Sequence, residues 1–134
     1  MANFNTSVRS ELGMPSSLSM SDLRLFNLVL KFSGSKDLAD ELLADHMAHV
    51  EAGFAEGIFV VGGPIVSGEG GWLLAHCIDI KELERFVARD PFVENSVVTP
   101  EIIEIAPMFM DGRIQPILGR KGSGYIAGAP RKSS

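Results

Sequence analysis

Apolar and polar residues follow two main periods along the chain, and these periods divide it into elements. Residues 23–32 are apolar on both faces, which is typical of a strand covered on both sides. Ser35 is suited to cap a helix, and apolar residues at helical spacing continue from there to Glu56 and stop at Gly57. The sequence therefore predicts a strand at 23–32 and then a helix of about five turns.

The rest of the chain predicts two more strands, a second helix and a last strand. A strand is expected at 58–66, where Gly62-Gly63-Pro64 indicates a bulge or a strand end. A glycine-rich turn leads to a strand at 72–78. The second helix starts at Asp79 and ends at Asp90-Pro91, because the residue before proline disfavours helical geometry. With a final strand at 97–108, the order predicts an α+β fold with both helices on one face of an antiparallel sheet.

The other sheet face carries a further prediction. The strands do not alternate cleanly between apolar and polar residues, so this face should also be covered. A chain of 134 residues that is 46% hydrophobic has enough core for one domain but not for two of ordinary size. We therefore expect a homodimer, or a higher homo-oligomer, with two sheets packed face to face.

Composition and charge define the ends of this domain and its class. We expect a leader at 1–21, the domain at 22–110 and an extended basic arm at 111–134. Residues 112–134 hold five bases and no acids, which leaves a net charge of -10 on the remainder and argues against a nucleic-acid partner. No apolar run approaches the roughly 18 residues of a membrane span, and no secretory segment is visible. The single cysteine, Cys77, excludes an intrachain disulfide, so we expect a cytoplasmic protein.

His46 is the first candidate for chemistry. It occupies the middle of the apolar stripe of the first helix, where a partly buried imidazole needs a polar partner. A core histidine tied to a carbonyl or carboxylate for structure alone is the alternative. Asp90 likewise has a structural interpretation, since an Asp before Pro often hydrogen-bonds nearby amides at the end of a helix.

The chain resembles the YciI (YCII-related) family over roughly residues 23–108. The residues that carry the resemblance are His46, Glu56-Gly57, Gly63-Pro64 and Asp90-Pro91-Phe92, in that order. The resemblance implies a ferredoxin-like βαββαβ protomer that forms a dimeric α+β barrel. It also implies a dyad of His46 and Asp90 in a cleft beside the sheet.

Such a dyad would transfer protons near neutral pH, with the carboxylate fixing one imidazole tautomer. Gly63 and Pro64 are predicted as a wall of the ligand cleft, although a structural bulge explains them equally well. Phe92 is a candidate lid over the ligand, or plain packing. His49 either pairs with Asp45 on the exposed side of the helix or lines the cleft.

His46 and His49 at i, i+3 spacing without further ligands do not predict a metal site. The glycine-rich segment 119–124 lacks the ending of a phosphate loop.

Three functions follow from these residues. The first is a small enzyme of lyase or isomerase type, without a cofactor, that acts on a small cyclic or aromatic-derived acid. The second is a non-catalytic protein that binds a small molecule in the same cleft. The third is an interaction protein that works through its arms.

Overall fold

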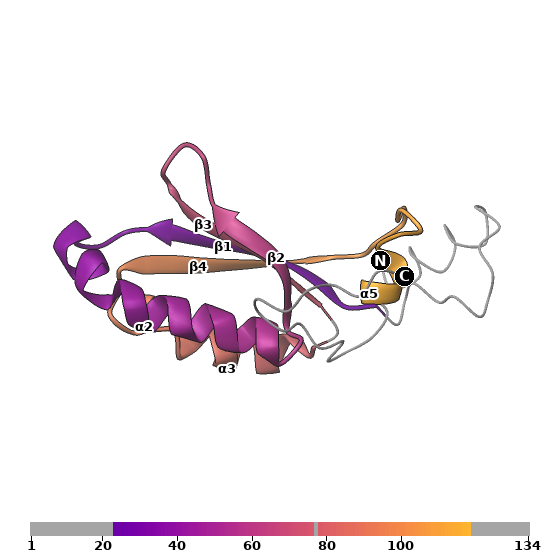
Figure 1. The fold of residues 1–134 in the computed structure, drawn as a ribbon, viewed down its shortest axis with the longest axis horizontal. Coiled ribbons are helices and arrows are strands. Elements are labelled where there is room, and N and C mark those ends of the chain that lie inside the picture. The colour runs from indigo at the N-terminus through magenta and orange to yellow at the C-terminus, as the bar shows by residue number, and fades with distance from the viewer. Residues whose placement is uncertain (1–22, 77, 119–134) are drawn as a thin grey trace.

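The structure is a computed structural model that describes residues 23–76 and 78–118. Four strands form one antiparallel sheet in the order β2-β3-β1-β4. Figure 1 shows α2 and α3 on the same side of that sheet. The elements are β1 (Leu25–Phe32), α2 (Lys36–Ala55), β2 (Phe59–Pro64), β3 (Gly70–His76), α3 (Ile80–Ala88), α4 (Pro91–Glu94), β4 (Val98–Ile105) and α5 (Gln115–Leu118). The predicted βαββαβ order is confirmed, and the short helices α4 and α5 are additions to it.

Helix α2 begins and ends where the sequence predicts. The side chain of Ser35 accepts a hydrogen bond from the backbone N–H of Leu38 at 3.2 Å, as an N-cap does. Gly57 follows the C-cap with φ of 77°, a left-handed conformation in which a side chain would be strained. Near its end, α2 presents Gly53 to the ring of Phe59, where a Cβ atom would collide with ring carbons. The helix can therefore lie close against the core only because that position has no side chain.

Strand β2 differs from its prediction in the position of its bulge. The register shift lies between Phe59 and Val61, before the glycines. Gly62, Gly63 and Pro64 pair regularly with β3, and the strand ends at Pro64. A bulge at 62–64 is therefore wrong, and the alternative of a strand end at the proline holds. This end suits proline, because Pro64 has no N–H to donate to a sheet ladder.

The core lies between the sheet and the helices. Phe26, Leu28 and Leu30 alternate along β1 toward the helical side and are at most 3% exposed. They pack with Leu73 and Ala75 of β3 and with residues of β2 and the helices, which are Phe59, Leu83, Phe86, Val87 and Phe92. This single core cluster fixes the two helices over the two central strands.

The opposite sheet face is apolar and partly uncovered. Val61, Ile103 and Ile105 point to this side and are 40–48% exposed. At one end of the face, His76 is buried beneath α5, and its Nδ1 lies 3.1 Å from the carbonyl oxygen of Leu118. Residues 115–118 of the predicted arm are therefore helical and packed on the sheet. The predicted leader, Cys77 and the glycine-rich segment 119–124 lie outside the described residues.

Candidate functional site

Asp90 sits at the junction of α3 and α4. Its extended backbone, with φ of -64° and ψ of 126°, is the conformation that the following Pro91 favours. One carboxylate oxygen, Oδ1, accepts a hydrogen bond from the backbone N–H of Phe92 at 2.9 Å and so caps α4. The expected structural role as a turn residue is therefore present, although it does not occupy the whole carboxylate.

The same carboxylate meets His46 from α2. The Nδ1 atom of His46 lies 2.9 Å from both Oδ1 and Oδ2 of Asp90, and the two side chains are 14% and 4% exposed. Because a carboxylate accepts, Nδ1 carries the hydrogen in this contact and Nε2 holds the lone pair of the neutral ring. Within the described part of the chain, Nε2 has no hydrogen-bond partner. The arrangement thus leaves one imidazole nitrogen free for an external group.

Phe92 fixes the plane of the His46 ring. The two rings stack with centroids 4.0 Å apart and planes 3° apart. Phe92 itself is only 5% exposed, so it packs within the protein and touches the imidazole from one side. The structure therefore places the Phe92 ring against one face of the His46 ring.

His49 turns into the core. The predicted exposed pair with Asp45 is wrong: the described residues include no ion pair between them, and the His49 ring stacks on Phe86 with centroids 4.2 Å apart. Burial lowers the pKa of His49, an effect that the negative charge of Asp90 and a hydrogen bond with the Phe86 backbone partly oppose. Burial has the larger effect on the pKa, because transferring an imidazolium out of water is more unfavourable than these two contacts are favourable. His49 is therefore a neutral, inward-facing ring.

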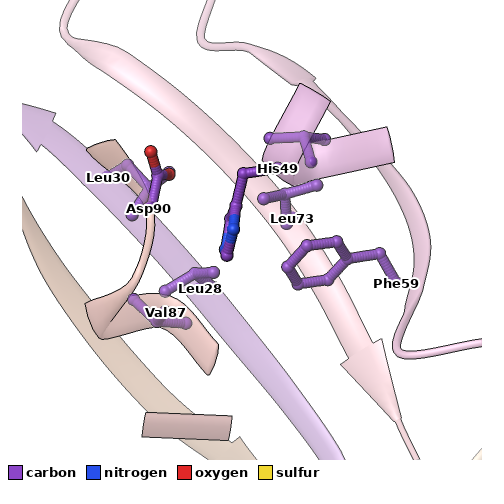
Figure 2. Close-up of a pocket in the computed structure, with 8 residues that line it drawn as sticks. Leu28, Leu30, His49, Phe59, Leu73, Val87 and Asp90 are labelled. Atoms are coloured by element: carbon purple, nitrogen blue, oxygen red, sulfur yellow. The ribbon is translucent and has the colours of Figure 1, made fainter. Parts of the chain in front are cut away.

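His49 and Asp90 line a small cavity beside the sheet (Figure 2). Its volume is about 10 Å³, and its other walls are apolar side chains that include Leu28, Leu73 and Val87. This space is about the size of one water molecule. A separate open groove of about 300 Å³ lies between the helices and β4, and it is lined by Glu84, Val87, Ala88, Val93, Pro100 and Ile102. No pattern in the sequence singled out this groove.

Gly63 and Pro64 lie apart from these features. Both are exposed on the edge strand β2, and neither lines the small cavity or the groove. A Cβ atom built on Gly63 would have no heavy atom within 4 Å. Within this chain, the structure joins His46, Asp90 and Phe92, with His49 alongside, and leaves Gly63 and Pro64 outside the group.

The described residues hold neither a cluster of metal-ligating side chains nor a membrane-spanning helix. They contain no group of three or more His, Cys, Asp or Glu side chains placed to hold a metal ion. Among them, no helix is both long and apolar enough to cross a bilayer.

Comparison with known proteins gives a family and a fold. The family model described as the YCII-related domain matches residues 26–108. No curated protein sequence matches the chain significantly. One similar solved structure is 5-chloro-2-hydroxyhydroquinone dehydrochlorinase (TftG) from Burkholderia phenoliruptrix AC1100, in complex with 2,5-dihydroxybenzoquinone. It has 22% identity and a TM-score of 0.51, and the match covers 66% of this chain and 96% of that one.

A second similar structure is SnoaB, a cofactor-independent oxygenase from Streptomyces nogalater. It has 14% identity and a TM-score of 0.39, and the match again covers 66% of this chain and 96% of that one. At these identities, the likeness to TftG concerns the fold, and SnoaB adds no argument of its own.

Proposed function

The chain belongs to the YCII-related domain family and has the fold of the dimeric α+β barrel proteins, and on that premise we propose that it is a small-molecule enzyme of lyase or isomerase type. In this proposal His46 gives and takes the proton, and Asp90 orients it. The observation that carries the proposal is the 2.9 Å contact between Nδ1 of His46 and the buried Asp90 carboxylate, with Nε2 left free. The hydrogen bond of His46 to Asp90, its stacking on Phe92 and its partial exposure all support the role of His46 as the proton-transfer residue.

The geometry favours proton transfer at Nε2. Asp90 holds the hydrogen on Nδ1 and stabilises the imidazolium that forms when Nε2 accepts a second proton. Stacking on Phe92 holds the plane of the ring, so Nε2 needs no reorientation during the reaction. General acid or base help of this kind contributes about 10²- to 10⁴-fold in rate. The pair therefore suits isomerisation, or elimination of a leaving group next to an acidic C–H or O–H.

The ligand class we propose is a small cyclic acid or an oxidised aromatic compound. Such compounds carry acidic hydrogens whose removal needs only a positioned base. The TftG structure contains 2,5-dihydroxybenzoquinone, and this compound is a suitable first probe for the present chain. The predicted ligand contacts of Gly63, Pro64, Phe92 and His49 stay predictions. Of these four, Phe92 and His49 lie nearest to the proposed dyad.

We also propose that the uncovered sheet face packs against a second copy of the chain. Val61 on β2 and Ile103 and Ile105 on β4 are exposed apolar residues of this face. Burying apolar surface of this kind stabilises an assembly by about 25 cal/mol for each Å² removed from water. An identical sheet is a matching partner, as a two-fold dimer uses the same patch on both subunits.

The test is a comparison of turnover and binding in one variant. His46→Asn retains much of the side-chain volume and an amide for hydrogen bonding but cannot shuttle a proton. We expect a loss of about 10²-fold or more in turnover of hydroxylated benzoquinones and cyclic acids, with nearly unchanged ligand affinity by calorimetry. Asp45→Asn, on the exposed side of the same helix, is the matched control and should behave as the parent chain. A variant that loses affinity instead would identify a binding protein without catalysis.

A further inference from the structure

The cavity beside Asp90 has the polarity of a water site. Two of the side chains that line it are polar, His49 and Asp90, and the rest are apolar. Figure 2 shows the His49 ring between Asp90 on one side and Leu73 and Phe59 on the other. A buried water needs space of about one probe sphere, roughly 10–15 Å³, and at least two polar partners. The cavity lies at the lower limit of this size and has the two polar partners, His49 and Asp90.

His49 offers an acceptor to this cavity. Its Nε2 atom is buried and has no hydrogen-bond partner among the described residues. A hydrogen bond with the Phe86 backbone, which we assign to the other nitrogen, Nδ1, opposes the lowering of the His49 pKa. A carbonyl that accepts from Nδ1–H leaves a lone pair on Nε2 of the neutral ring. Leaving that lone pair without a donor in an apolar core is unfavourable.

Asp90 also has capacity to spare. Its two oxygens can accept about four hydrogen bonds, and the described residues supply two donors, the N–H of Phe92 and Nδ1–H of His46. Asp90 is only 3% exposed, so bulk water supplies little of the remainder. A third donor inside the cavity would satisfy the buried carboxylate.

We propose that this cavity binds one ordered water molecule that donates one hydrogen to the Asp90 carboxylate and the other to Nε2 of His49. A water molecule can donate one hydrogen to each of these two acceptors, whereas two acceptors cannot hydrogen-bond to each other. His49 is then a positioning residue: it holds the water, the water holds the carboxylate, and the carboxylate holds His46. The water site does not depend on whether His46 is catalytic.

A high-resolution crystal structure and NMR test the water directly. We expect an ordered water about 2.7–3.2 Å from both Nε2 of His49 and an Asp90 oxygen. Ring nitrogen-15 shifts should show the hydrogen of neutral His49 on Nδ1. A dry cavity, a direct bond from His49 to Asp90, or the hydrogen on Nε2 would each overturn the proposal.

Two variants separate the nitrogen from the packing. His49→Phe keeps a flat ring against Phe86 but has no acceptor, so the water should be lost and the carbon-13 signal of the Asp90 carboxyl should shift. His49→Gln places an amide near the position of Nε2, so it should retain the water and a carboxyl signal near that of the parent chain. Equal signals in the two variants would contradict the proposed role of His49. Turnover in His46→Asn is a separate measurement, so failure of the water site and failure of the catalytic proposal are distinguishable.

Discussion

Asp90 joins two roles in one side chain, and that overlap explains why the sequence admitted two interpretations. It caps α4 through the N–H of Phe92 and it receives Nδ1 of His46. Spacing along the chain predicted the first role, because an Asp before Pro is a turn residue. The partnership with His46 followed only from the resemblance to a family, since the two residues are 44 positions apart. A pattern of neighbouring residues does not predict this contact, because tertiary packing brings His46 and Asp90 together.

Substitutions at Asp90 should measure the combined contribution of its two roles to stability. Asn is also a good helix cap and can still accept from Nδ1 of His46, so Asp90→Asn should lower the free energy of unfolding by only about 1 kcal/mol. Asp90→Ala removes the cap and the buried acceptor together and should cost about 2–4 kcal/mol. Urea unfolding monitored by circular dichroism measures both values. Equal losses in the two variants would show that neither the cap nor the buried acceptor stabilises the fold.

His49 should make stability depend on pH. Its pKa is lowered in the folded chain from the ordinary value of 6.5, chiefly by burial, with Asp90, Arg89 and His46 as the nearby charged groups. Below pH 6.5, His49 therefore binds a proton more readily in the unfolded chain than in the folded chain. The free energy of unfolding consequently falls as the pH drops. Urea unfolding at about pH 7.5 and about pH 5.5 measures this fall. His49→Phe should show a smaller fall than the parent chain, and an equal or larger one would remove His49 as the cause.

At the scale of elements, the sequence predicted order and type well and irregular features poorly. The cap at Ser35 and the stop at Gly57 place α2 because both depend on local backbone chemistry. Helix α4 was missed because four residues are too few to show a period. The bulge was misplaced because it depends on pairing with β3, which glycine content does not reveal. The inward turn of His49 depends likewise on Phe86 of α3.

The close approach of α2 to the core predicts an unusual response at Gly53. Alanine normally stabilises a helix interior relative to glycine by about 1 kcal/mol. At Gly53, however, the new methyl group would meet the rings of Phe59 and Phe86, so Gly53→Ala should destabilise the fold by about 1–3 kcal/mol. Ala48→Gly, at an exposed position of the same helix, is the control and should cost about 1 kcal/mol through propensity alone. Thermal unfolding compares the two, and a Gly53→Ala protein more stable than its parent would refute the close contact.

At the scale of the whole molecule, the exposed sheet face predicts the behaviour in solution. Ile103 is 43% exposed on this face, opposite Asn27 of β1. Ile103→Lys should convert a dimer into a monomer because it would bury a charge at the proposed interface. Light scattering after size-exclusion chromatography gives the mass, and circular dichroism checks the fold.

Val66→Lys is the matched control for this test. Val66 is fully exposed in the connection between β2 and β3, outside the paired strands. The Val66→Lys protein should keep the parent mass. A monomeric parent chain, or an Ile103→Lys dimer, would exclude the proposed interface.

The strand order also constrains how the chain folds as the ribosome makes it. Strand β1 emerges first, yet it lies at the centre of the sheet and pairs only with β3 and β4, not with β2, which follows it. Its backbone hydrogen-bonding groups must wait for partners from much later in the chain, which is the kind of non-local pairing that slows folding. Chains arrested before Val98 would leave one edge of β1 open. Such nascent chains should depend on chaperones until β4 has left the exit tunnel.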